Sequence, residues 1–525
     1  MIIRPNRRQF IAATAGASAT AVVGASAAWA GPTARQPPNL LLILADDLGW
    51  SDTQPYGGEA FTPNLARLAS GGQRLTHFYN IGKCYPSRAS LLTGQLNHRA
   101  GFGGGIALDT GTARGSGPYR GYLAPETPTL AELLSRRGYR SYISGKWHLG
   151  EAPEHWPDQR GFDRSFGLIS GASSHYELLQ ERERTRVMAR DGIPWTPPDS
   201  GFFSTDTYGE MAVEMLRDHE RSHSAQPFFL YLAYTAPHFP IHAPREDRAR
   251  YRGRFAGGWD LLRRERFARL RELGLIDERF AQTPRPSGIL GWDTVRDRGV
   301  WEQRMETYAA MIERMDRSIG QVLARIQAMG QLDNTLIVFA SDNGASHEDV
   351  SGRNLHRHDS AIGDRGSYES IRAPWAWAAN APFQFHKDTP YEGGIASSAI
   401  VHWPGGIASN RVCRERFHFA DVVPTMMELA GQDVEGFYGR SMIPALRGET
   451  TPPRSLFTAH LAKAAFISED WKLVRPGSSA PWSLFNLADD PVEAHDLASR
   501  EPDRVAHMAR EWTSIARREG VRGIA

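Results

Sequence analysis

The sequence predicts an α/β fold, in which a large mixed β-sheet is flanked by helices and followed by a small C-terminal α+β subdomain. Continuous apolar runs of strand length recur between helical segments, at 39–45, 228–234 and 335–340. Such runs are typical of strands that are buried on both faces of a sheet. After about residue 450 short strands and turns replace this alternation, and a helix is expected over 502–518.

The composition restricts the class of protein. The chain has 525 residues, enough for one large domain and a smaller one. Charged residues make up 23% and the formal net charge is +2, which argues against nucleic-acid binding as the main task. Cys84 and Cys413 are too few for a disulfide framework, although a single bond between them is an alternative in an exported protein.

The first thirty residues predict a targeting segment. Arg7 and Arg8 precede a short run of Ala, Gly, Thr and Val that ends in AWA at Ala30. This pattern is typical of a twin-arginine signal peptide over 1–30, with a membrane anchor as the alternative. We therefore expect a bacterial protein that uses the Tat export machinery and is soluble in the periplasm or secreted. No later segment of the sequence is apolar enough for the mature protein to insert stably into a membrane.

The remaining elements are expected in chain order within a catalytic domain over 31–450 and a C-terminal subdomain over 451–525. Helices are predicted where a threonine and a proline precede an apolar period of 3.6 residues, as at Thr62 and Thr127. The clearest helical period covers 301–329. Further strands are expected at 139–143, 399–403, 456–460, 465–468, 471–474 and 482–486, and a further helix at 421–430.

Two regions are ambiguous. Residues 151–205 are rich in Pro, Gly, Trp and charge, which predicts irregular loops that could select the substrate. The Arg-rich region 245–272 contains a helical period and is interpreted as a solvated helix with a basic outer face. Binding of a polyanionic substrate is the alternative for this region.

The segment 83–94 reads KCYPSRASLLTG and predicts a loop that enters a helix. Pro86 suits a first helical turn because it has no N–H group to lose. Free N–H groups at a helix start attract anions, and Arg88 lies about one turn beyond Cys84. A thiol at this position is expected to have a lowered pKa.

Polar residues follow four of the apolar strands. Because ligands bind outside the carboxyl ends of strands in open α/β sheets, these residues are expected to meet at one edge. Adjacent carboxylates need compensation for their repulsion and burial, and oxygen ligands favour Ca²⁺ or Mg²⁺. The residues are Asp46, Asp47, Lys146, His148, His238, Asp342 and Asn343.

These segments together resemble the type I sulfatases of the alkaline phosphatase superfamily. The run CYPSRASLLTG is similar to the signature of that family, in which the cysteine is oxidised to Cα-formylglycine. This chain has Ala396 where family members often carry arginine, a difference that concerns the anchoring of a loop rather than the chemistry. The other matching segments are ADDLG at 45–49, GKWHLG at 145–150, APH at 236–238, SDNG at 341–344, and Lys387 before EGG at 392–394.

The resemblance implies a cofactor and a maturation step. A formylglycine-generating enzyme would convert Cys84 to the aldehyde. Asp46, Asp47, Asp342 and Asn343 would hold a divalent cation, usually Ca²⁺ in this family with Mg²⁺ possible, and this cation would also contact the modified Cys84.

The resemblance also implies a role for each remaining side chain. One hydroxyl of the hydrated aldehyde would attack sulfur, with Asp342 as a base. Lys387 and His238 would bind sulfate oxygens and protonate the leaving alcohol. Two further cations, Arg88 and Lys146, would neutralise charge on the nucleophile. His148 would take the proton from the second hydroxyl, so that sulfate leaves and the aldehyde returns.

We therefore expect an exported sulfuric ester hydrolase that resembles bacterial arylsulfatases. Its substrate would be a sulfate monoester of a small molecule or a carbohydrate. A phosphodiester or phosphonate monoester hydrolase with the same aldehyde and metal site is the nearest alternative. A non-catalytic binder of sulfated glycans, with Cys84 unmodified, is an alternative of a different class. The intact set of polar residues argues against that binder.

Overall fold

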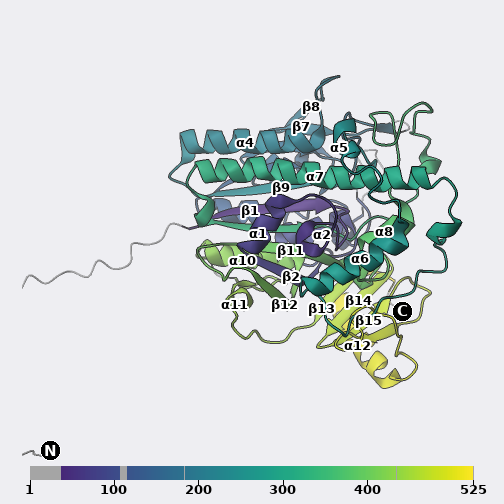
Figure 1. The fold of residues 1–525 in the computed structure, drawn as a ribbon. Coiled ribbons are helices and arrows are strands. Elements are labelled where there is room, and N and C mark those ends of the chain that lie inside the picture. The colour runs from purple at the N-terminus through teal and green to yellow at the C-terminus, as the bar shows by residue number, and fades with distance from the viewer. Residues whose placement is uncertain (1–36, 107–114, 182–183, 433, 524–525) are drawn as a thin grey trace, which may run out of the picture. The chain divides into compact units, whose positions relative to one another are not determined.

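The computed structural model describes residues 37–106, 115–181, 184–432 and 434–523 (Figure 1). Pro37–Ala525 form one compact unit. The predicted signal peptide over 1–30 lies outside the described residues. No helix within the described ranges is long and apolar enough to cross a bilayer.

A ten-stranded mixed sheet forms the centre of this unit, in the order β12-β2-β11-β10-β1-β9-β3-β4-β7-β8. β1 pairs in parallel with both β10 and β9, whereas β11 runs antiparallel to β10 and β2. The predicted fold class, a large mixed sheet, is confirmed. The strands are β1 (Asn39–Asp46), β2 (Gln73–Tyr79), β3 (Arg140–Gly145), β4 (Arg164–Leu168), β7 (Met188–Arg190), β8 (Ile193–Trp195), β9 (Phe228–Pro237), β10 (Thr335–Ser341), β11 (Ala396–His402) and β12 (Arg411–His418).

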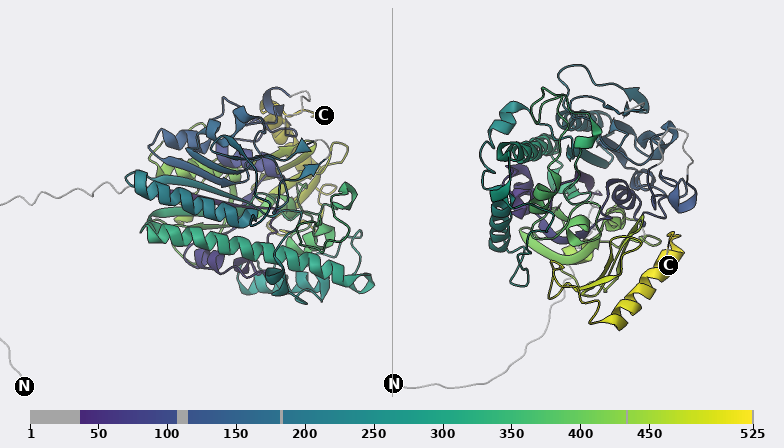
Figure 2. Two further views of the ribbon diagram at one scale, coloured as in Figure 1. Left: turned by 90° about the horizontal axis from the view of Figure 1, so that it is seen from above. Right: turned by 90° about the vertical axis from the view of Figure 1, so that its right-hand side faces the viewer.

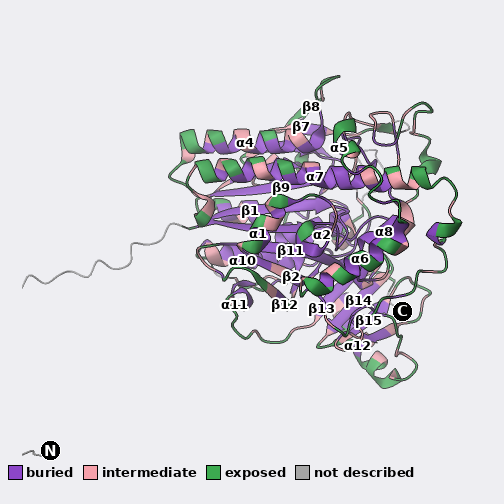
Figure 3. Ribbon diagram, in the orientation of Figure 1, coloured by how far each residue is buried: buried purple, intermediate pink, exposed green. Residues whose placement is uncertain are grey.

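Helices cover both faces of the sheet (Figure 2). Side chains alternate along β1, so that Leu41 and Ile43 pack with α1, α4 and α7, while Leu42 and Leu44 pack with α2, α3 and α10. The central strands are buried, the edge strands β12 and β8 are partly exposed, and the helices expose mainly their outer faces (Figure 3). The helices are α1 (Pro63–Ser70), α2 (Cys84–Thr93), α3 (Leu130–Ser135), α4 (Ser204–His223), α5 (Arg245–Ala249), α6 (Gly258–Glu272), α7 (Arg298–Ala328), α8 (Arg372–Ala379), α9 (Glu392–Ile395), α10 (Val422–Leu429) and α11 (Ile443–Leu446).

A second, antiparallel sheet follows near the C-terminus, and helix α12 (Pro502–Arg518) packs against it. Trp512 of α12 is buried and stacks on Phe457 at a ring distance of 5.5 Å. The predicted small sheet with one helix is therefore present, although the boundary at residue 450 stays a prediction. The strands are β13 (Leu456–His460), β14 (Lys463–Ser468), β15 (Trp471–Arg475) and β16 (Ser483–Asn486).

Residues 151–205 are more regular than their composition predicts. This region contributes β4, β7 and β8 to one edge of the main sheet, and the two-residue strands β5 (Gln180–Glu181) and β6 (Arg184–Thr185) form a separate hairpin. The 20-residue helix α4 begins at its end and was not predicted. These edge strands are too short for an alternating pattern to be read from the sequence.

Two local predictions need correction. The side chain that caps α3 belongs to Thr129, which accepts a hydrogen bond from the backbone N–H of Glu132, rather than to Thr127. The basic face of α6 is only partly solvated, because Arg263 and Arg266 are buried. Buried Arg266 forms ion pairs with Asp52 and Glu59. Part of the positive charge of α6 is therefore neutralised inside the protein instead of facing solvent.

Candidate active site

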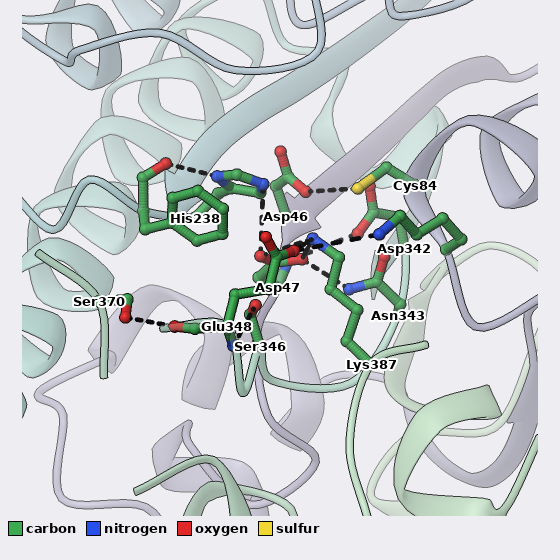
Figure 4. A network of polar contacts seen from close by, with 12 residues as sticks. Asp46, Asp47, Cys84, His238, Asp342, Asn343, Ser346, Glu348, Ser370 and Lys387 are labelled. Carbon is green, nitrogen blue, oxygen red and sulfur yellow. Dashed lines mark hydrogen bonds and ion pairs between the residues drawn. The ribbon is translucent and has the colours of Figure 1, made fainter. Parts of the chain in front are cut away.

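Four neighbouring strands deliver polar side chains to one edge of the sheet. Asp46 is the last residue of β1, and Asp342, His238 and Lys146 follow the ends of β10, β9 and β3. Those strands are adjacent in the order β10-β1-β9-β3. The parallel register aligns the ends of β1 and β10, and the backbone N–H of Asp342 donates to the carbonyl of Ala45 at 3.1 Å. The sheet therefore gathers these residues as the sequence predicts, and Asp46, His238 and Asp342 are seen together in Figure 4.

The acidic side chains are paired with buried cations. Lys146 Nζ lies 2.5 Å from Asp46 Oδ2, and Lys387 Nζ lies 2.8 Å from Asp47 Oδ1. All four side chains expose 2% of their surface or less.

A third pair involves Arg88, which donates from Nε to Asp342 Oδ2 at 2.8 Å. Arg88 also donates from Nη1 to the carbonyl of Lys146, which fixes the guanidinium against the strand end. Cations that could neutralise a bound anion thus lie beside every carboxylate that follows a strand.

The two strand-end carboxylates differ in their affinity for protons. Burial raises the pKa of Asp342 to about 7, and the negative charge of Asp46 acts in the same direction. Burial also opposes ionisation of Asp46, but Lys146, His238 and Arg88 together hold the pKa of Asp46 well below its usual range. Asp46 is therefore the more strongly acidic member of the pair, and Asp342 is the member that holds a proton more tightly.

Cys84 is the first residue of α2, and only 2% of its surface is exposed. Its Sγ lies 3.5 Å from Asp46 Oδ1. Burial raises the pKa of this thiol to about 12, and Asp46 and Asp342 add to the effect. The expected lowering of the pKa is wrong, because desolvation and the two carboxylates outweigh the opposing charges of Lys146 and Lys387. The alternative disulfide is also wrong, since Cys84 and Cys413 are both free.

Two histidines border the charged cluster. His238 Nε2 lies 3.5 Å from Asp47 Oδ2, and its Nδ1 lies 2.5 Å from the carbonyl oxygen of Phe239. His148 has a left-handed backbone (φ 58°), and its ring meets the edge of Tyr85 at 5.5 Å. Burial lowers the pKa of both histidines, and for His148 the charges of Lys146 and Arg88 lower it further.

The cluster offers ligand atoms for a divalent cation. One ligand atom each from Asp46, Asp47, Cys84 and His238 lie within 4.8 Å of one another. Asn343 donates from Nδ2 to Asp47 Oδ1 at 2.7 Å, while its buried Oδ1 has no hydrogen-bond donor among the described residues. An amide oxygen without a donor beside two carboxylates is the arrangement that an oxygen-seeking cation completes.

Several contributing residues have no clear signal in the sequence. Glu348 Oε1 lies 3.8 Å from Lys387 Nζ, at the more exposed side of the cluster. The hydroxyl of Tyr231 lies 3.4 Å from Arg88 Nη1. Tyr308 of α7 donates to the carbonyl of Asp47 at 3.0 Å. Tyr231 and Tyr308 lie inside apolar runs that predict core positions, so only the fold connects them with the site.

A buried thiol beside a cation site, surrounded by lysine, arginine and neutral histidine, defines a hydrolase site for an anionic ester. The family model described as Sulfatase matches residues 38–432, and the chain belongs to this family. It is an enzyme that hydrolyses sulfate esters. The family implies a metal ion and formylglycine, and the cluster described above offers a metal site.

Individual proteins agree with the family assignment. An uncharacterised sulfatase of Schizosaccharomyces pombe is 34% identical over 92% of this chain and 94% of its own length. An arylsulfatase of Klebsiella aerogenes is 34% identical over 75% of this chain and 87% of its own length. Among solved structures, Ps i-CgsB in complex with k-i-k-neocarrahexaose is 27% identical over 92% of this chain and 93% of that one, with a TM-score of 0.68.

Proposed function

We propose that the chain hydrolyses sulfate esters of carbohydrates, with Cys84 converted to formylglycine as the catalytic group. The observation that carries the proposal is the setting of Cys84. A buried thiol with a raised pKa is a poor nucleophile, yet it occupies the centre of a fully formed polar site, 3.5 Å from Asp46. Conversion to formylglycine supplies a carbon that carries two hydroxyls once hydrated, one for attack on sulfur and one for release of sulfate.

We further propose that Asp46, Asp47, Asp342 and Asn343 hold a divalent cation together with the converted Cys84. Ca²⁺ is the proposed ion, because a set of carboxylate and amide oxygens suits a hard cation, with Mg²⁺ as the alternative. Bound there, the cation supplies Lewis-acid polarisation of sulfate oxygens.

The cations of the site divide into two roles. Lys387 and His238, both beside Asp47, are proposed to bind oxygens of the sulfate group. Lys146 and Arg88, which lie beside Asp46 and Asp342, are proposed to neutralise negative charge on the nucleophile formed from Cys84. Charge-assisted hydrogen bonds in a water-poor site stabilise developing negative charge strongly.

Four side chains are assigned to proton movement. Asp342 is the proposed base because it lies directly after β10, beside Asp46 and the approach to Cys84, and burial raises its pKa. His238 and Lys387 are adjacent to Asp47 and are proposed to protonate the leaving alcohol. His148 is held neutral by burial and by two nearby cations, so it is proposed to take the proton from the second hydroxyl.

The carbohydrate part of the proposal rests on the similarity to Ps i-CgsB, whose structure contains k-i-k-neocarrahexaose. The export part rests on Arg7, Arg8 and the AWA motif. We propose a Tat signal over 1–30, periplasmic or secreted placement, and aldehyde formation by a maturation enzyme. The catalytic and C-terminal parts are proposed to divide at residue 450.

The test combines mass spectrometry with turnover of three substrates. The peptide containing Cys84 from active protein is expected to carry the mass of formylglycine and to react with a hydrazide. Cys84→Ser should fold and lose nearly all turnover, whereas Cys413→Ser, the matched control, should retain it. Sulfated sugars and aryl sulfates should be hydrolysed faster than an aryl phosphodiester. Full activity with an unmodified thiol at Cys84, or a preference for the phosphodiester, would contradict the proposal.

A further inference from the structure

A buried ion triad joins the C-terminal sheet to the segment that follows Lys387. Lys472 of β15 places its Nζ 2.7 Å from Oε1 of Glu392 and 2.8 Å from Oε1 of Glu493. None of the three side chains exposes more than 2% of its surface. Glu493 lies in the loop between β16 and α12, so two of the three charges belong to the C-terminal subdomain.

The triad acts on the start of α9. Glu493 Oε2 accepts a hydrogen bond from the backbone N–H of Glu392 at 2.7 Å, and Tyr79 donates its hydroxyl to Glu392 Oε2 at 3.2 Å. The side chain of Gln384 donates to the carbonyls of Val492 and Glu493. The first residue of α9 and the loop before it are therefore both attached to the same C-terminal loop.

α9 in turn contacts the segments that carry the proposed catalytic groups. The N–H of Gly393 donates to the carbonyl of Gln384, three residues before Lys387. The N–H of Gly344, next to Asn343, donates to the carbonyl of Gly394.

The third contact is with the loop that leads to Cys84. The N–H of Asn80 donates to the carbonyl of Ile395 at 2.8 Å, and the N–H of Asp388 donates to the carbonyl of Gly82 at 2.8 Å. α9 is thus a junction of the Lys387 loop, the Asn343 loop and the approach to Cys84.

The glycines of α9 leave no freedom for a shift. A Cβ on Gly394 would lie 2.2 Å from the carbonyl oxygen of Thr389, and a Cβ on Gly393 would lie 2.1 Å from that of Gln384. Because backbone packs directly on backbone here, a displacement of α9 is transmitted to the Lys387 loop.

We propose that Lys472 is a positioning residue for sulfate ester hydrolysis, which acts through Glu392 to fix α9 and hence Lys387 and Asn343. A hydrophobic contact would also hold the two sheets together, but it would not fix the direction of α9. The charge-assisted hydrogen bond from Lys472 to Glu392 and the ion pair of Lys472 with Glu493 do fix it. The inference rests on the roles proposed above for Lys387 and Asn343. It makes the C-terminal sheet a functional part of the catalytic site, although it contributes none of the proposed catalytic side chains.

Lys472→Met is the direct test, measured as kcat and KM on an aryl sulfate well below the melting temperature. We expect kcat to fall roughly 10- to 100-fold, since sub-ångström to ångström misplacement of catalytic groups has effects of this size. The formylglycine content at Cys84 should be unchanged. Lys472→Arg, which keeps the charge, should recover most of the loss. Arg475→Met is the matched control, because Arg475 lies on the same strand but packs on Trp482 and Trp512, and it should leave kcat within twofold.

A second variant separates position from stability, because Lys472→Met leaves two buried carboxylates and can fail to fold. The triple variant Lys472→Met, Glu392→Gln and Glu493→Leu removes the charges together, a change that often preserves or raises stability. A folded triple variant with reduced kcat supports positioning. A folded Lys472→Met or triple variant with the kcat of the wild type would overturn the inference. If instead the wild type lacks turnover and the aldehyde, the proposed function has failed and not this inference.

Discussion

Lys146 Nζ lies 2.5 Å from Asp46 Oδ2, and neither side chain exposes any surface to solvent. A buried carboxylate needs a compensating charge, and here the chain provides one from the end of β3, which is separated from β1 by β9. The same carboxylate is a proposed ligand of the divalent cation. The pair therefore allows the site to be fully formed before a cation binds.

Removal of the cation should lower stability without unfolding the protein. At a free Ca²⁺ concentration 100 times the dissociation constant, binding stabilises the native state by about 2.7 kcal/mol. We expect a chelator to lower the melting temperature and to abolish turnover, and Ca²⁺ to restore both. Asp46→Asn should remove the response to Ca²⁺, whereas Glu278→Gln, a change at an exposed acid, should keep it. Equal melting curves in chelator and in excess Ca²⁺ would exclude the cation site.

Arg266 of α6 is expected to be among the residues most important for stability. Its guanidinium is 1% exposed and forms ion pairs with Asp52 at 2.6 Å and Glu59 at 2.8 Å. Arg266→Met leaves the buried carboxylate of Asp52 without its partner cation and leaves Glu59 paired with Arg269 alone, which should cost roughly 3–5 kcal/mol.

Urea unfolding monitored by circular dichroism measures this loss. Arg264→Met is the matched control on the same helix, because Arg264 is exposed, and it should change stability by less than about 0.5 kcal/mol. Similar losses of unfolding free energy in the two variants would show that the buried ion pairs of Arg266 stabilise the protein no more than an exposed arginine does.

Glu493 should make stability depend on pH. Burial and the nearby charge of Glu392 raise the pKa of Glu493 to about 7, despite the opposing effect of Lys472. The folded protein therefore holds this proton more tightly than the unfolded chain does. The resulting stabilisation is complete below pH 4.5 and is lost as pH rises through 7.

Glu493→Gln removes this titration while preserving the side-chain volume. The wild type should lose stability from this group between pH 5 and pH 8, and the variant should not. The change in the free energy of unfolding between the two pH values should therefore be smaller in the variant, by on the order of 2 kcal/mol. Comparison with the wild type cancels the contributions of other groups, Asp342 included. An unchanged difference between the two pH values would show that Glu493 titrates normally.

The proposed export route depends on Arg7 and Arg8, which lie outside the described residues. Replacement of both by lysine keeps the positive charge but removes the twin-arginine pattern. We expect this variant to accumulate in the cytoplasm, as detected by fractionation and immunoblotting, with Arg4→Lys as the control. Normal export of the double variant would contradict the assignment.

Much of the fold follows from local sequence patterns. The apolar runs at 39–45 and 335–340 correspond to β1 and β10, and the expected helix over 502–518 coincides with α12. α4 was missed although Tyr208, Met215 and its other buried residues follow a helical period, because its remaining positions are polar and charged. Packing against the rest of the protein, rather than local helix propensity, determines that such a segment is helical.

The candidate site was predictable where its residues follow strands, because the sheet brings strand ends together. The thiol pKa of Cys84 was not predictable, because it depends on carboxylates that come from positions 38 residues before it and 258 residues after it. The same holds for the triad, since nothing near Lys472 in the sequence indicates that its partner is Glu392. Electrostatic surroundings of this kind exist only in the assembled fold.

The complete burial of α2 affects the timing of biosynthesis. All ten residues of this helix are buried, and Cys84 is enclosed by strand ends from distant parts of the chain. A maturation enzyme of the proposed kind could not reach the thiol in the folded protein, so the proposed conversion of Cys84 would have to take place on the nascent or still unfolded polypeptide. Folding and modification are then competing reactions, and the fraction of aldehyde in a preparation records which was faster. Conditions that accelerate folding would yield more native but inert molecules.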